Sequence, residues 1–210
     1  MLWFKRVSAQ INRPAHILSP IKPSFILASA SPRRVELLRQ IGLTPSQVIP
    51  AEIDETEHDE ETPGHLALRL AGEKAAAVAA QHPDAVILAA DTVVACGRRI
   101  LPKAESEQQA RACLTLLSGR RHRVYGGIAV QAGRQQWRRN VVTMVRFARL
   151  TAADIDAYVA SGEWQGKAGG YAIQGLAGAF VTSINGSYTN IVGLCVHTTA
   201  RLLAAAQKRE

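Results

Sequence analysis

The segment with the clearest potential for chemistry is FILASASPRR at 25–34, in which an apolar run ends in serines and two arginines. Arg33 and Arg34 fall in the first turn of a predicted helix, where positive charge opposes the helix dipole. A bound triphosphate removes this conflict, because it accepts hydrogen bonds from the free amides and from both guanidinium groups. Ser29 and Ser31 add hydroxyl donors at the same place. The sequence therefore predicts a phosphate-binding corner, with two solvent-exposed arginines at a helix end as the alternative.

A second chemical signal is Asp91, which interrupts the apolar run AVILAADTVVAC at 85–96. No turn residue flanks it, so the pattern predicts that it lies within a strand. Burying an unpaired carboxylate is costly, so a cation, a metal or hydrogen-bond donors must face it. Such a carboxylate is suited to act as a general base or acid. A structural aspartate bonded to backbone amides is the alternative.

Two lysines and an acidic segment complete the set of candidates. Lys74 borders the apolar face of a predicted amphipathic helix, and Lys103 follows a turn. Either lysine can equally be a surface residue whose stem covers apolar side chains. Residues 51–63 hold seven acids and no base. Asp54 and Glu55 are predicted ligands for Mg²⁺ or Mn²⁺, since hard cations take carboxylate and phosphate oxygens; a solvated acidic loop is the alternative.

The elements that must position these residues alternate along the chain. Predicted strands cover 25–29, 46–53, 85–96, 121–132, 136–149 and a segment near 190–195. Predicted helices run from Ser31 as N-cap to Gly42, over 64–82, from a capping box of Ser106 and Gln109 to Ser118, over 151–161, and to about 206 at the end. Alternation with hairpins between the strands indicates an α/β fold with a mixed sheet and flanking helices.

Composition excludes two classes of protein. With 210 residues, 47% of them apolar and 20% charged, the chain has enough apolar side chain for a sizeable core, which excludes disorder over most of its length. The longest apolar run is far shorter than the ~20 residues of a spanning helix. Three scattered cysteines argue against a disulfide framework and a structural zinc site, and they favour a cytoplasmic location.

The net charge of +8 is unevenly distributed. Residues 1–23 hold four basic residues and no acid, and they are predicted to be a basic, flexible extension to a single domain over 24–207. Residues 97–140 hold ten Lys or Arg against two acids. Segregated charge of this kind favours a polyanionic ligand in a cleft, and a solvated basic face is the alternative.

The candidate residues sit in segments that resemble a known family, the Maf (septum-formation-inhibitor-like) nucleoside triphosphate pyrophosphatases. The first, ILASASPRRVELL at 26–38, is similar to the family signature S-x-S-P-R-R-x-E-L-L. Others follow in the family's order over about 24–200: RLAGEKA (69–75), LAADTVV (88–94), ILPKA (100–104), LLSGRRHRVY (116–125), GKAGGYAIQGLAGAFV (166–181) and INGSYTNIVGL (184–194).

The resemblance implies more than the residues do by themselves. It implies a twisted mixed sheet in an inosine-triphosphatase-like fold, with two lobes around a deep cleft, and a homodimer. It implies hydrolysis of a nucleoside triphosphate to the monophosphate and pyrophosphate with a divalent metal. Asp91 is then the expected proton acceptor. The residues expected to hold the triphosphate are Ser29, Ser31, Arg33, Arg34, Lys74 and Lys103.

The same resemblance bears on the choice of base. Thr92 after Asp91 is similar to the branch that prefers dTTP and UTP, whereas members acting on 7-methyl-GTP tend to carry glutamine there. Arg33 and Gln174 match the other two positions associated with pyrimidines. Two alternatives stay open: a 7-methyl-GTP-specific pyrophosphatase, and a non-catalytic regulator of septum formation that binds nucleotide or nucleic acid. Neither a nucleic acid nor a membrane is the expected partner.

Overall fold

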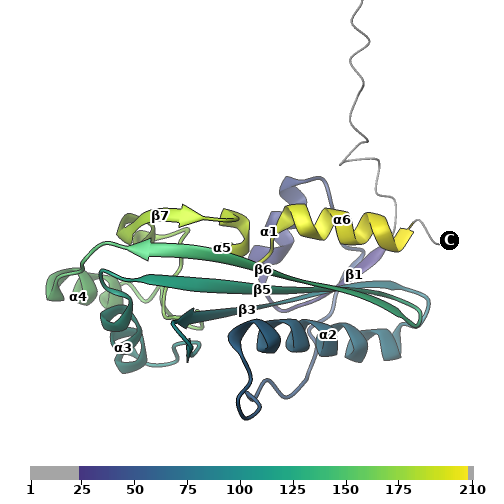
Figure 1. Ribbon diagram of the computed structural model, residues 1–210. Helices are drawn as coiled ribbons and strands as arrows, with labels where there is room; N and C mark the ends of the chain where they lie inside the picture. Colours follow the sequence, from purple (N-terminus) through teal and green to yellow (C-terminus); the bar gives the residue numbers. More distant parts are fainter. Residues whose placement is uncertain (1–23, 208–210) are drawn as a thin grey trace, which may run out of the picture.

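A seven-stranded mixed sheet forms the centre of the protein in the computed structural model, which describes residues 24–207 (Figure 1). The strand order is β2-β1-β3-β5-β6-β7, and β4 pairs with β3 off this path. β1 is parallel to β2 and β3, and the other pairs are antiparallel. The strands are β1 (Phe25–Ala28), β2 (Gln47–Val48), β3 (Val86–Cys96), β4 (Arg99–Leu101), β5 (Arg121–Ala132), β6 (Gln135–Phe147) and β7 (Val181–Asn185). The predicted α/β class with a mixed sheet is confirmed.

Helices cover both faces of this sheet (Figure 1). They are α1 (Pro32–Gln40), α2 (Pro63–Gln81), α3 (Glu107–Leu117), α4 (Ala152–Ala160), α5 (Tyr188–Val192), α6 (Val196–Gln207) and a 3₁₀ turn at Leu176–Phe180. α2 and α6 lie on opposite faces. Side chains of β1 alternate accordingly: Ile26 joins the apolar cluster under α2, whereas Leu27 joins the larger core on the other face. No helix within residues 24–207 is long and apolar enough to cross a membrane.

Two predicted strands are wrong in whole or in part. The strand predicted near 190–195 is absent: Tyr188–Val192 is the helix α5, whose first turn is capped by the Ser187 hydroxyl, and the last strand is β7 instead. A short apolar run does not distinguish strand from helix by periodicity, and here the cap decides. The strand predicted over 46–53 is reduced to β2, because Pro50 has no N–H to donate to a ladder.

Helix starts also differ in detail from the sequence patterns. Ser31 is the N-cap residue of α1 as predicted, but its side chain makes no capping hydrogen bond. Ser106 caps α3 by accepting from the Gln109 amide, whereas the Gln109 side chain bonds the Glu105 amide, so the predicted capping box is half formed. The predicted extension at 1–23 lies outside the described residues.

Candidate active site

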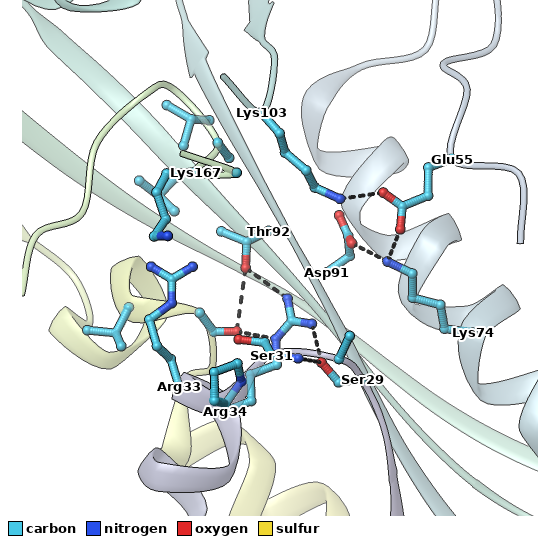
Figure 2. Close-up of a pocket in the computed structure, with 18 of the residues that line it drawn as sticks. Ser29, Ser31, Arg33, Arg34, Glu55, Lys74, Asp91, Thr92, Lys103 and Lys167 are labelled. Carbon is cyan, nitrogen blue, oxygen red and sulfur yellow. Dashed lines mark hydrogen bonds and ion pairs between the residues drawn. The ribbon is translucent and has the colours of Figure 1, made fainter. Parts of the chain in front are cut away.

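A cavity of about 560 Å³ opens where β1 ends, beside the middle of β3. Its wall also includes the start of α1, the acidic segment before α2 and a glycine-rich loop at 165–168 (Figure 2). Segments that are far apart in the sequence therefore meet at this cavity. Most of the residues predicted for the site line this cavity: Ser29, Ser31, Arg33, Arg34, Glu55, Lys74, Asp91, Thr92 and Lys103.

Four of these residues form a neutralised cluster of two cations and two carboxylates: Glu55, Lys74, Asp91 and Lys103 (Figure 2). The Lys74 ammonium lies 2.7 Å from Asp91 Oδ1 and 2.6 Å from Glu55 Oε1. Lys103 Nζ lies 2.5 Å from Glu55 Oε2. Asp91 is 4% exposed and Lys74 is 7% exposed, so each supplies the partner that the other requires when removed from water.

Asp91 reaches this cluster because β3 carries it through the centre of the sheet. It is paired on one side with β5, where it faces Gly127, and its neighbours Ala89 and Ala90 are buried. The prediction that Asp91 lies within a strand, where a cation, a metal or hydrogen-bond donors must face it, is confirmed: the strand is β3 and the partner is Lys74. Asp91 Oδ1 is bonded to Lys74, and Asp91 Oδ2 makes no hydrogen bond within residues 24–207. The second oxygen is thus available to a water molecule in the cavity.

Glu55 is the bridge of the cluster and is ionised at neutral pH. Partial burial raises the pKa of its carboxyl, but hydrogen bonds from Lys103 and Lys74 and their positive charges outweigh burial and lower the pKa to about 2. Its side chain is 40% exposed, so water still reaches it from the cavity mouth. Glu55 therefore fixes the positions of both lysines and neutralises part of their charge.

Arg34 is turned away from solvent and holds three segments together. Its Nε donates to the Gly193 carbonyl at 3.0 Å, Nη1 to Ser29 Oγ at 2.9 Å and Nη2 to Thr92 Oγ1 at 3.3 Å. Burial lowers the pKa of Arg34, and the charge of Asp91 opposes that effect. Gly193 has φ of 140°, a backbone conformation that favours glycine, and its carbonyl is presented to Arg34 there. Arg34 thus shapes the cavity wall.

Arg33 and Lys167 form a second group, here called the cationic pair. Both line the cavity, and Figure 2 shows their head groups directed toward each other. Among residues 24–207, none forms a hydrogen bond or ion pair with the Arg33 guanidinium, and Lys167 Nζ donates to the Gln165 carbonyl without pairing with an acid. Burial lowers the pKa of Arg33. Burial and the charge of Arg33 lower the pKa of Lys167, against a smaller effect of Glu163.

Lys103 and Lys167 are held at fixed places by a short backbone ladder. Lys103 pairs with Ala168 in an antiparallel bridge, and the Ala104 amide donates to the Lys167 carbonyl at 3.1 Å. Because side chains alternate along extended backbone, Lys103 is directed to Glu55 and Lys167 to the other side, toward Arg33. Gly169, at φ of 71°, allows the loop to approach β3: a Cβ there would lie 2.8 Å from Val94 Cγ1.

Two residues expected in the site lie elsewhere. The Asp54 carboxylate accepts from the amide and the hydroxyl of Thr56, and Asp54 does not line the cavity. Gln174 is exposed and does not line the cavity either. Sequence reasoning also missed Lys167. A lone lysine within a run of glycines was the available signal, since glycines permit close approach of backbone.

The donor groups present are compatible with a divalent metal ion brought in with a phosphate ligand. Two carboxylates, Glu55 and Asp91, face the cavity, and within the described part of the chain no group of three or more His, Cys, Asp or Glu residues is arranged to hold a metal. Mg²⁺ is commonly bound through one or two carboxylates, with substrate phosphates and water completing its shell. Glu55 and Asp91 are the residues that would hold such an ion.

The sequence was compared with models of protein families and with known proteins. The model of the family described as "Maf-like protein" matches residues 24–206. A dTTP/UTP pyrophosphatase of Paramagnetospirillum magneticum is 63% identical over 181 residues, which cover 85% of this chain and 95% of that protein. The dTTP/UTP pyrophosphatase of Caulobacter vibrioides is 58% identical, covering 87% and 95%. That of Maricaulis maris is 59% identical, covering 87% and 88%. The chain therefore belongs to the Maf-like protein family.

Proposed function

We propose that the protein is a nucleoside triphosphate pyrophosphatase that hydrolyses dTTP and UTP to the monophosphate and pyrophosphate. The observation that carries this proposal is the Asp91–Lys74 pair in a cavity that five cationic residues line: Arg33, Arg34, Lys74, Lys103 and Lys167. Relatives at 58–63% identity that bear the name dTTP/UTP pyrophosphatase supply the substrate class. The resemblance in sequence and the geometry of the cavity support the same reaction.

The reaction requires a proton acceptor and a place for negative charge. Asp91 Oδ2 accepts the proton of a water molecule, whose oxygen bonds one phosphorus of the α–β anhydride. The anhydride bond breaks, and its oxygen leaves with the other phosphorus, so that water, nucleotide and the two products balance. Lys74 holds Asp91 in place through Oδ1, and Lys103 faces the same cavity from its rim. Fixed positive charges stabilise the charge that develops on the phosphate oxygens.

The proposal includes a divalent metal ion, Mg²⁺ or Mn²⁺, which Glu55 and Asp91 would hold. When bound, it would neutralise charge on the phosphates and polarise them. Glu55 presents an ionised carboxylate at the cavity mouth for this purpose.

The finer expectations from the resemblance stay predictions. They are two lobes around a deep cleft, a homodimer, a cytoplasmic location, and base choice through Arg33, Thr92 and Gln174. Arg33 and Thr92 line the cavity, whereas Gln174 is exposed and is not among the lining residues.

A turnover screen with an isosteric variant tests the proposed function. Purified protein is incubated with canonical and modified nucleoside triphosphates and with Mg²⁺ or Mn²⁺, and monophosphate, diphosphate and pyrophosphate are resolved. Monophosphate and pyrophosphate from dTTP and UTP are expected, with loss on chelation of the metal. In Asp91→Asn, kcat is expected to fall by ~10²–10⁴-fold, the range for loss of a general base.

The matched control is Asp84→Asn, at an exposed aspartate just before the same strand. Turnover in this control is expected to equal that of the natural sequence. Turnover restricted to 7-methyl-GTP would retain the reaction and overturn the base assignment. Nucleotide binding without any turnover would favour the non-catalytic regulator and reject the enzyme.

A further inference from the structure

The two groups of charged residues in the cavity differ in their balance of charge. In the neutralised cluster, Lys74 and Lys103 face two carboxylates, so that the local charges cancel. In the cationic pair, Arg33 and Lys167 face each other, and within residues 24–207 neither pairs with an acid. The structure thus brings two like charges together in a partly buried place. The charge of Glu163 acts on Lys167, but the Glu163 carboxylate accepts from the Leu176 amide and forms no ion pair with Lys167 or Arg33.

Bringing like charges together is unfavourable unless an anion completes the arrangement. The fold nevertheless holds Arg33 and Lys167 close together, because the backbone of each is fixed by its own contacts. Arg33 is fixed in the first turn of α1, and its neighbour Arg34 anchors that turn to Gly193 and Thr92. Lys167 is fixed by the backbone ladder to Ala104 and Pro102. An arrangement that opposes electrostatics and is held by independent contacts indicates a binding site.

The two sides of the cavity should therefore receive different parts of a polyphosphate. The neutralised cluster contains Asp91, which must lie next to the anhydride bond that is hydrolysed. Its two lysines are already paired with carboxylates, so it offers less uncompensated positive charge to the most highly charged part of the ligand than the cationic pair does. Pyrophosphate carries more negative charge than a nucleoside monophosphate. The cationic pair, with two uncompensated charges, is complementary to it.

We propose that Arg33 and Lys167 bind the β- and γ-phosphates of the substrate and hold the departing pyrophosphate. This assignment rests on the proposed function and adds Lys167 to the residues that contact substrate. Arg33 supplies a planar fork of donors and Lys167 a compact point charge, a combination that can contact both phosphates of the group. The glycine-rich loop at 165–168 then serves to carry Lys167 to the phosphates.

Selective weakening of pyrophosphate binding tests this assignment. Binding of pyrophosphate and of dTMP is measured by calorimetry on the natural sequence and on Lys167→Gln, and the inhibition of dTTP turnover by each product is measured in parallel. In Lys167→Gln, the Kd for pyrophosphate is expected to rise by ~10-fold or more, the loss typical of one charge-assisted hydrogen bond. The Kd for dTMP is expected to change by less than ~2-fold.

Three further variants sharpen the result. Lys167→Arg retains the charge and is expected to recover most of the affinity for pyrophosphate. Arg33→Gln is expected to show the same selectivity as Lys167→Gln. Arg134→Gln removes an exposed charge at the β5–β6 turn, outside the cavity, and is expected to leave both Kd values unchanged.

The contrary outcomes are distinct from failure of the proposed function. Equal weakening for both products, greater weakening for dTMP, or no change would overturn the assignment while turnover of dTTP continued. Absence of pyrophosphate binding to the natural sequence would also overturn it. Because calorimetry does not require turnover, the subsite is tested even in a protein that proves inactive.

Discussion

The two sides of the cavity show two ways in which this fold manages charge. In the neutralised cluster, every charged group contacts one of opposite sign, at distances of 2.5–2.7 Å. In the cationic pair, the charges are alike, and neither residue forms an ion pair with an acid among residues 24–207. The first arrangement holds Asp91 in place beside Lys74. In the second arrangement, two positive charges repel each other, and an anionic ligand would relieve the repulsion. The cationic pair therefore indicates an anion-binding site.

Arg34 lies between the two sides and belongs to neither. It is next to Arg33 in sequence, yet it is buried and donates to three segments. Successive residues of a helix are rotated by about 100°, so Arg34 is buried in the cavity wall while the half-buried Arg33 is directed toward Lys167. The comparison predicts two classes of variant. Substitutions in the neutralised cluster or at Arg34 should lower the stability of the fold, and substitutions in the cationic pair should weaken ligand binding.

The largest effect is expected from Lys74→Met, which breaks the charge balance of the neutralised cluster. Asp91 and Glu55 are left facing each other without their shared cation. Because water enters from the cavity, the free energy of unfolding should fall by about 3 kcal/mol, the lower end for removal of one partner of a buried pair. Turnover of dTTP should be lost. Urea unfolding and kcat measure the two effects.

A double variant checks the cause of that loss. Lys74→Met combined with Asp91→Asn removes both buried charges, so it should be more stable than Lys74→Met by itself. Equal stability of the single and double variants would show that packing of the lysine stem, rather than the ion pair, stabilises the fold.

The second effect separates the adjacent arginines. Arg34→Met should lower the free energy of unfolding by about 3 kcal/mol, since hydrogen bonds to charged groups contribute ~1.5–3 kcal/mol each. Arg33→Met should change it by less than about 0.5 kcal/mol, because the Arg33 guanidinium forms no hydrogen bond or ion pair within residues 24–207 that could be lost. Arg33→Met should instead raise KM for dTTP. Denaturant unfolding measures the stability of both variants, and steady-state kinetics measures KM. Equal losses of stability in Arg34→Met and Arg33→Met would contradict the distinction between the two arginines.

The smallest effect concerns the pH dependence of stability through Glu55. Burial raises the pKa of this carboxyl, but contacts with Lys103 and Lys74 lower it from its ordinary 4.5 to about 2. A carboxyl whose pKa is depressed in the folded state stabilises the protein above its ordinary pKa, and this contribution is lost as the pH falls toward 2. The free energy of unfolding should therefore fall more steeply between about pH 5 and 2 in the natural sequence than in Glu55→Gln. Parallel curves would contradict the bridging role of Glu55.

Much of the site follows from local sequence because its residues break local rules. Asp91 in an apolar strand requires a partner, and two arginines at a helix start favour an anion. In both cases the unfavourable free energy follows from the local sequence, without knowledge of the fold. Elements were predicted well where long periodic or apolar segments existed, as at β3 and α2. The error at Tyr188–Val192 arose where a five-residue segment carried too little pattern to separate helix from strand.

By itself, the sequence determined which positions were unusual for their local structure: an aspartate within an apolar strand, and serines and arginines at the start of a helix. The tertiary structure decided which side chains contact these residues. Glu55 rather than Asp54 reaches the lysines, and Arg34 rather than Arg33 is used to hold the wall. Lys167 meets Arg33 only through pairing of its loop with the segment around Lys103. Contacts between segments so far apart in the chain depend on the path of the backbone, which composition and spacing do not encode.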